Sequence, residues 1–461
     1  MPASPSTARA INDRLALRLL QQEGPLTAGQ LKQLTGLSRP TVADLVERLT
    51  ASGLITVVGE SGEQRRGPNA RLYGIVADRA HLAALDVRTE GVFVLVSDLV
   101  GRVLAESSVP IRGDTGTGPA VEQAVAAVER TAKEAGADRL HTVGIGAPGL
   151  IDPATGDLRD SAGLPAWHRS LAAALQERLP GSRVTVENET NLAALAEQRE
   201  GAARDRDTFV LLWLGHGVGA AVVLDGTLRR GASGGTGEIG FLPVPGTASL
   251  PSTTDCDGGF HSLAGAAAVG ALGRECGLPV PGTTDGPGAA VVVRGAVARV
   301  TEVPERAAGG TGAGTGDAAT GPGPCEGAGP GGAAAGPGPG GHRGAGERAS
   351  TEPTEASPAG PAPAEAGAAA RFLDALADRI VVGVASVVAV LDPGCVVLGG
   401  EVGQAGGAAL AQRVEERLRR MSPLATEVRA SSLGGTAVLR GALLTARERA
   451  QDELFPLPAR A

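Results

Sequence analysis

The stretch VTVENETNLAALAEQREG, residues 184–201, decides the fold, because it runs from an apolar strand through a polar junction into a helix. The β-branched run 184–186 predicts a buried strand, and the apolar spacing after residue 191 predicts a helix. Polar side chains crowd the junction between them. Those with donors and acceptors suited to sugar hydroxyls are Asn188, Glu189 and Asn191.

The continuation of this region, residues 208–240, predicts two strands and a glycine-rich loop. The apolar strand 209–214 ends in three alternating glycines, which either let the backbone pass close to a ligand or turn two antiparallel strands. These are Gly215, Gly217 and Gly219. A hairpin turn is predicted at 224–227, and the loop 234–240 then carries one carboxylate, Glu238.

These motifs resemble the core of the ROK family, which is named for repressors, open reading frames and sugar kinases. The resemblance implies an α/β fold of the actin-like ATPase type with two lobes. It also implies that Asn188, Glu189 and Glu238 bind a sugar. In the kinases of the family, a glycine turn like that at 215–219 holds nucleotide phosphate.

Two further loops match the sugar side of the family pattern. The segment 146–152 matches a Gly-x-Pro-Gly-x-x-Asp loop and adds Gly149 to the implied sugar-binding residues. The segment 160–167 matches a second loop, although Gly163 stands where the family has Asn. We expect Trp167 to pack in the core rather than to stack on a sugar.

The zinc loop of the family is largely lost in this chain. The His that follows the Glu238 motif is replaced by Phe241, and of the four zinc-loop ligands only Cys256 survives. Structural zinc needs four ligands, so we expect no metal. The alternatives are a remnant site made by Cys256 and His261, or a sugar contact supplied by His261.

The nucleotide-handling motifs also depart from the kinase pattern. Residues 86–90 replace Asp-x-Gly-Gly-Thr and place a carboxylate where phosphate would lie, which disfavours phosphate binding. His216 replaces a Thr, and Glu189 replaces the Asp base. The longer side chain moves the carboxylate by about 1 Å, and such a misplacement can cost about 100-fold in rate. The degenerate nucleotide loops comprise Asp86, Gly215, Gly217, Gly219, Gly399 and Gly400, with Glu401 in place of a Gly. We therefore expect no cofactor and no catalytic residue beyond the vestigial base position Glu189.

The first 78 residues predict three helices followed by a hairpin. Residues 11–22 form the first helix, and Thr27 caps the second with Gln30 completing a capping box. Ser38 caps the third helix, with Pro40 in its first turn. The residues expected to face inward are Ile11, Leu15, Leu19 and Leu20, then Ala28, Leu31 and Leu34, then Val42, Leu45, Val46 and Leu49.

A capped helix pair followed by a hairpin with a basic tip is typical of a winged helix-turn-helix that binds DNA. The third helix would enter the major groove, and the tip between strands 54–58 and 71–75 resembles the Gly-Arg-Pro wing of ROK repressors. The expected DNA-binding residues are Ser38, Arg39, Thr41, Asp44, Arg48, Arg65 and Arg66. The alternatives are a protein-contact module or arginines on a solvated face.

Composition and charge agree with a regulator of this kind. The net charge is -8, but residues 1–77 hold nine basic and six acidic residues, so this end carries +3 and the remainder -11. A basic end on an acidic body indicates one DNA-contacting module. We expect a cytoplasmic protein without signal peptide or membrane span, because no long apolar run occurs and the four cysteines lack paired spacing.

The expected domains are a winged helix at 1–78, a first lobe at 79–200, and a second lobe at 201–302 and 367–455. The segment 303–366, rich in Gly, Ala and Pro, is expected to be a disordered insertion because it has almost no large apolar side chains to bury.

The hypothesis that follows is a transcriptional regulator, a repressor, that binds double-stranded operator DNA as a homodimer or a dimer of dimers. A sugar or sugar phosphate would close the two lobes and change the spacing of the winged modules. One alternative is an active sugar kinase with an accessory DNA-binding domain. Another is a constitutive DNA-binding protein whose body only dimerises.

Overall fold

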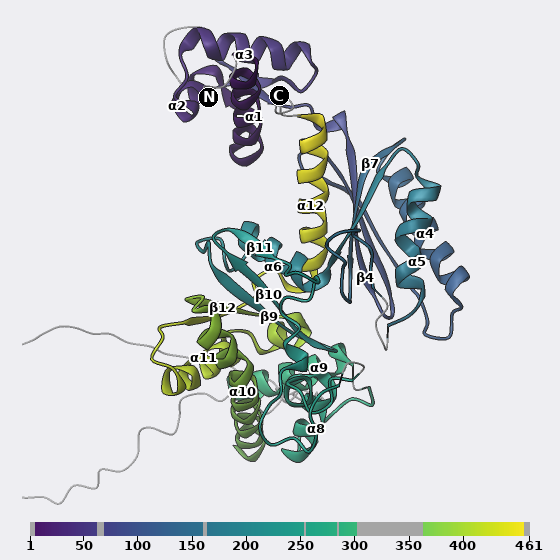
Figure 1. Cartoon of the computed structure of the whole chain (residues 1–461), viewed down its shortest axis with the longest axis vertical. Helices are drawn as coiled ribbons and strands as arrows, with labels where there is room; N and C mark the ends of the chain where they lie inside the picture. The colour runs from purple at the N-terminus through teal and green to yellow at the C-terminus, as the bar shows by residue number, and fades with distance from the viewer. Residues whose placement is uncertain are drawn as a thin grey trace, which may run out of the picture.

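The computed structural model describes residues 5–61, 69–159, 164–252, 255–283, 285–301 and 363–455 (Figure 1). These residues form an amino-terminal module and two lobes, each lobe built on its own five-stranded sheet. Within the described residues, no helix combines the length and apolarity needed to cross a membrane.

The amino-terminal module is a winged helix. Its elements are α1 (Pro5–Glu23), β1 (Leu26–Thr27), α2 (Ala28–Thr35), α3 (Arg39–Ala51), β2 (Ile55–Glu60) and β3 (Arg71–Ile75). The capping predictions are confirmed, since Thr27 and Gln30 form a capping box and Ser38 caps α3. The tip of the wing, with Arg65 and Arg66, lies outside the described residues.

The buried faces of α1 and α2 differ from the prediction. On α1 the core residues are Ala16, Leu17 and Leu20, whereas Ile11 and Leu15 are 48% and 39% exposed. On α2 only Leu31 is buried; Leu34 is 51% exposed and Ala28 is also exposed. The predicted buried face of α1 was wrong because this helix contacts the body of the protein as well as its own module. The stripe on α3, Val42, Leu45, Val46 and Leu49, is confirmed.

The first lobe contains η1 (Ala77–Arg79), β4 (His81–Arg88), β5 (Gly91–Asp98), β6 (Val103–Pro110), α4 (Thr117–Glu134), β7 (Leu140–Ala147), α5 (Trp167–Arg178) and β8 (Arg183–Asn188). Its strand order is β6-β5-β4-β7-β8, with β4, β7 and β8 parallel. Helices α4 and α5 cover one face, where Trp167 is 3% exposed in the core, as predicted.

The second lobe repeats this plan with the order β11-β10-β9-β12-β13, in which β9, β12 and β13 are parallel. Its elements are β9 (Phe209–Leu214), β10 (Val218–Leu224), β11 (Thr227–Arg229), η2 (Ile239–Phe241), α7 (His261–Ala264), α8 (Ala266–Glu275), α9 (Gly286–Thr301), α10 (Pro363–Leu391), β12 (Cys395–Gly399), α11 (Gly400–Met421) and β13 (Glu427–Ala430). The predicted hairpin turn is present, with Asp225 and Gly226 at positive φ.

Two boundaries in this lobe correct the prediction. Helix α10 begins at Pro363, so the last residues of the predicted insertion 303–366 are helical; residues 302–362 lie outside the described part of the chain. Helix α11 begins at Gly400, so Gly400 and Glu401, expected in a nucleotide loop, lie in the first turn of a helix, and a non-helical break follows at Gly407. The sequence prediction read the segment before this break as a loop because glycines dominate it.

Helix α12 (Ala437–Leu454) lies on the other face of the first-lobe sheet, and helix α6 (Glu189–Glu200) packs between α12 and the second-lobe strands β9 and β10 (Figure 1). Helix α12 was assigned to the second lobe, but it packs on α6, β4 and β7. A methyl group at Gly441 would lie 2.0 Å from the carbonyl oxygen of Leu192, so the two helix backbones touch. Helix α12 had been assigned to the second lobe because it follows the strands of that lobe in the sequence, and this assignment was wrong.

Candidate functional site

Asn188 holds the strand-to-helix junction together. It ends β8 and caps α6, its Oδ1 accepting from the backbone N–H groups of Thr190 at 2.9 Å and Asn191 at 3.2 Å. Its Nδ2 donates to the Gly149 carbonyl at 3.0 Å and to Glu189 Oε2 at 2.8 Å. All four hydrogen-bonding positions of this amide are therefore engaged. Asn188 positions both Gly149 and Glu189, which the sequence prediction described only as ligand contacts.

Glu187 is a residue of this site that the prediction missed. Its buried carboxylate accepts from Asn191 Nδ2 at 2.9 Å and from Arg230 Nε at 2.6 Å. The side chain of Asn191 is thus turned toward Glu187. The signal available in the sequence was the unbroken polar run 187–191 after a buried strand, since a carboxylate there needs a partner when buried.

The loop that carries Glu238 is packed by glycines against the two neighbouring segments. A methyl group at Gly234 would lie 2.0 Å from the carbonyl oxygen of Ile151, and one at Gly237 would lie 1.8 Å from that of Ala220. Because no side chain fits at either point, the loop reaches both the segment after Gly149 and strand β10. The structure therefore brings Gly149, Asn188, Glu189 and Glu238 to one place.

The acidic side chains at this site affect one another's pKa values. Burial raises the pKa of Glu189 to about 8, and the negative charges of Glu238, Asp86 and Glu401 act in the same direction. Burial also raises the pKa of Glu238. Glu189 is therefore a protonated hydrogen-bond donor near neutral pH.

We expect this raised pKa to appear in the stability of the chain. Between pH 4.5 and about 8, Glu189 binds more protons in the folded than in the unfolded state, so its contribution to stability falls as pH rises through this range. Glu189→Gln cannot titrate and should lose that part of the pH dependence. Thermal unfolding of both proteins across the range measures the difference, with Glu200→Gln as an exposed control on the same helix. Identical profiles for wild type and Glu189→Gln would contradict the assignment.

His261 and the remnant zinc loop lie beside this group. His261 begins α7, and its pKa is lowered by burial and by the proximity of His216. Phe241, in place of the family His, is 40% exposed. Within the described residues, no set of three His, Cys, Asp or Glu side chains is arranged to hold a metal ion.

The degenerate nucleotide loops come from both lobes. Gly215 and Gly217 lie at the turn between antiparallel strands β9 and β10, which is one of the two roles foreseen for these glycines, and Gly219 lies within β10. Gly399 ends β12, and Gly400, at φ 74°, begins α11. In the first lobe, Asp86 is buried and pairs with Arg88 at 2.7 Å. An internal ion pair thus stands where the family pattern has phosphate-binding glycines.

The predicted DNA-binding residues on α3 divide into two groups. Ser38 and Arg39 are exposed at the start of the helix, and Thr41 is hydrogen-bonded to Ser38 at 2.8 Å. Arg48 instead pairs with Asp13 of α1 at 2.5 Å and also with Asp44. In this structure, Arg48 fastens α3 to α1 through Asp13, and Asp44 of α3 pairs with the same guanidinium.

Comparison with known proteins identifies both parts of the chain. The model of the ROK family matches residues 83–273 and 354–449, and the model of the MarR family matches residues 11–67. A xylose repressor from Caldicellulosiruptor bescii is 25% identical over 240 residues, covering 51% of this chain and 59% of the repressor. The transcriptional regulator NagC of Escherichia coli is 27% identical over 246 residues, covering 51% and 58%. The chain thus spans less than two thirds of the length of these relatives.

Solved structures agree on the fold. A ROK family transcriptional regulator, a homologue of the Escherichia coli MLC protein, aligns over 97% of this chain and 98% of its own with a TM-score of 0.66 and 18% identity. A ROK hexokinase from Thermus thermophilus aligns over 81% of this chain and 99% of its own, with a TM-score of 0.54 and 25% identity. The predicted fold class is confirmed: the chain belongs to the ROK family and carries a winged helix at its amino-terminal end.

Proposed function

We propose that the chain is a DNA-binding transcriptional repressor that senses a sugar in the ROK cleft. The observation that carries the proposal is a continuous packed connection. It leads from the residues at the start of α6, through α12, to the winged helix. Similarity to named repressors supports the DNA-binding half of the proposal.

The connection to the winged helix is made by the end of α12. Gln451 Nε2 donates to Gln21 Oε1 of α1 at 2.9 Å, and Arg14 of α1 forms an ion pair with Asp452. Gln21 Nε2 in turn donates to the carbonyl of Val100, in the turn between β5 and β6, at 3.0 Å. A shift of α12 along the first lobe therefore acts directly on α1.

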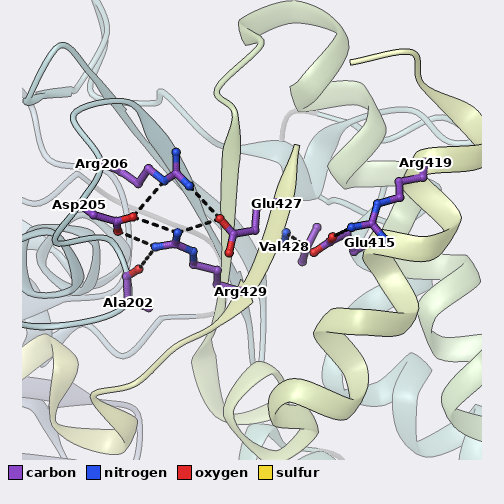
Figure 2. Close-up of polar contacts among 8 residues, drawn as sticks. All are labelled: Ala202, Asp205, Arg206, Glu415, Arg419, Glu427, Val428 and Arg429. Carbon is purple, nitrogen blue, oxygen red and sulfur yellow. Dashed lines mark hydrogen bonds and ion pairs between the residues drawn. The ribbon is translucent and has the colours of Figure 1, made fainter. Parts of the chain in front are cut away.

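The far end of α6 is tied to the second lobe. Arg429 of β13 donates to the Ala202 carbonyl at 2.7 Å and pairs with Asp205 at 2.6 Å, in the segment just after α6 (Figure 2). Arg206 of the same segment pairs with Glu427 at 2.8 Å (Figure 2). When the second lobe moves on closure around a sugar, these contacts transmit the movement to α6. The contact of α6 with α12 then transmits it to the winged helix.

The mechanism proposed is thermodynamic linkage in a homodimer or dimer of dimers acting in the cytoplasm. Two winged modules read half-sites about 34 Å apart, so a small change in their spacing alters operator affinity. A coupling of about 1–3 kcal/mol corresponds to a change of about 5- to 150-fold.

A sugar kinase is the rival function, because ROK kinases share the fold. Phosphoryl transfer needs a positioned base, a phosphate cradle and a metal ion. Here the base position is Glu189 with a raised pKa, and the first phosphate loop holds the Asp86–Arg88 pair. These features favour a sensor without kinase activity. ATP turnover with glucose, N-acetylglucosamine or xylose separates the two functions.

The proposed function is tested by operator binding. The wild-type chain is used to select a duplex from a random library, and affinity for that duplex is measured with and without a panel of sugars. We expect one class of sugar to change the affinity by about 5- to 150-fold. Strong duplex binding that no sugar alters would refute the sensor and leave a constitutive DNA-binding protein.

A further inference from the structure

Glu401 fills the place where three loops of the second lobe converge. It lies in the first turn of α11, and its carboxylate lies over Gly215 of the β9–β10 turn and Gly286 at the start of α9. A methyl group at Gly215 would lie 2.3 Å from Glu401 Oε2, and one at Gly286 would lie 3.1 Å from Glu401 Cδ. The Oε2 atom is buried and has no hydrogen-bond partner among the residues that the structure describes.

The position of Glu401 is one that suits an anion. The start of a long helix presents unpaired backbone N–H groups and the positive end of the helix dipole. Here the chain supplies the negative charge itself. An external phosphate at this place would have to displace the Glu401 side chain.

Arg88 lies on the first-lobe side and is already engaged. It pairs with Asp86 through two hydrogen bonds, at 2.7 and 3.0 Å, and donates to the Gly435 carbonyl at 3.2 Å. Its guanidinium also lies 4.5 Å from the centre of the Phe93 ring. The negative charges of Asp86 and Glu401 help to raise the pKa of Arg88 above its ordinary value, against the opposing effect of burial. The positive charge of Arg88 is therefore neutralised by carboxylates of the chain and is not free to bind an anionic ligand.

Two other arginines near the sugar loops are paired as well. Arg230 binds Glu187 at 2.6 Å, and Arg159 binds Asp152 at 2.8 Å. A phosphate group would thus meet the acidic side chains of Asp86, Glu238 and Glu401. The hydroxyl groups of an uncharged or aminated sugar, in contrast, donate hydrogen bonds to carboxylate oxygens.

We propose that Glu401 occupies the phosphate-accepting half of the cleft, so that the chain responds to an unphosphorylated sugar and binds neither a nucleotide nor a sugar phosphate. The statement about sugars rests on the proposed function. The statement that the chain binds no nucleotide rests only on the geometry around Glu401.

The test measures ligand binding to the purified full chain by isothermal titration calorimetry. The ligands are neutral and aminated sugars, the phosphorylated form of each, and ADP with Mg²⁺. The variants are Glu401→Gly, which removes volume and charge, Glu401→Gln, which removes charge but keeps volume, and Glu90→Gln, an exposed control in the turn after β4. Thermal unfolding of each variant verifies that it is folded.

We expect wild type to bind an unphosphorylated sugar at least about tenfold more tightly than its phosphate, and to show no binding of ADP. Glu401→Gly should gain ADP binding by at least about tenfold, while Glu401→Gln and Glu90→Gln should not. The inference is overturned if wild type prefers a sugar phosphate, if it binds ADP, or if Glu401→Gly gains nothing. A failure of the proposed function would appear separately, as operator binding that no sugar changes, and would leave the ADP result intact.

Discussion

Replacing Glu197 by alanine is expected to lower the free energy of unfolding by about 3–5 kcal/mol. Glu197 is fully buried in α6, and its carboxylate accepts from the backbone N–H groups of Ala202 at 2.6 Å, Ser432 at 3.1 Å and Leu433 at 3.3 Å. It also accepts from the hydroxyl groups of Ser431 at 2.5 Å and Ser432 at 3.3 Å. Alanine would leave these five donors without their acceptor.

Chemical denaturation of the variant and the wild type measures this difference. Glu200→Ala is the matched control, because Glu200 lies on the same helix and pairs with Arg440 at 3.0 Å at an exposed position. The control should change stability by about 1 kcal/mol or less. Glu197→Gln keeps one acceptor oxygen and should fall between the two. Equal effects of Glu197→Ala and Glu200→Ala would show that the Ser431–Leu433 segment is held by other contacts.

Glu197 also joins the two lobes, so its loss should affect regulation. The segment that it binds follows β13 of the second lobe and leads into α12. Without this anchor, movement of the second lobe would reach α6 through the ion pairs of Arg429 and Arg206 and through the packing of α6 on β9 and β10. In the operator assay, a folded Glu197→Gln variant should therefore bind DNA with a weakened response to sugar.

Local features of the fold could be predicted because the residues that determine them are neighbours in the chain. Thr27 and Gln30 are three residues apart, and the positive φ angles of Asp225 and Gly226 belong to one turn. The strand-to-helix junction at Asn188 was predicted for the same reason, since a cap is local to its helix.

Long-range features could not be predicted in this way. The buried face of α1 depends on contacts such as Gln21 with Gln451, which lie 430 residues apart. The location of α12 beside α6 depends on the absence of a side chain at Gly441, which has meaning only when Leu192 lies opposite. In the sequence, Glu187 and Glu197 could not be distinguished from the other acidic residues in and next to helix α6. Their roles depend on partners at Arg230 and at 431–433, which no periodicity indicates.

Replacing Arg39 by alanine is expected to weaken operator binding by about 10- to 100-fold, or about 1–3 kcal/mol. Arg39 is the first residue of α3 and is exposed, next to the capping residue Ser38. In a helix-turn-helix, the start of the second helix points into the major groove. Arg48, the other arginine of this helix, is held by Asp13 and Asp44, so Arg39 is the better placed of the two to reach DNA.

Affinity for the selected duplex, measured by fluorescence anisotropy at several salt concentrations, tests this assignment. Arg18→Ala is the matched control, because it removes the same charge from an exposed position on α1 of the same module. Arg39→Lys keeps the charge but loses the two-pronged donor geometry of arginine. If Arg39 reads a base, the lysine variant should lose affinity for the selected duplex and discriminate less against mismatched ones. If Arg39 contacts only phosphate, lysine should restore affinity and alanine should reduce the salt dependence by about one counterion. Equal losses for Arg39→Ala and Arg18→Ala would instead mean that α3 does not enter the groove by its first turn.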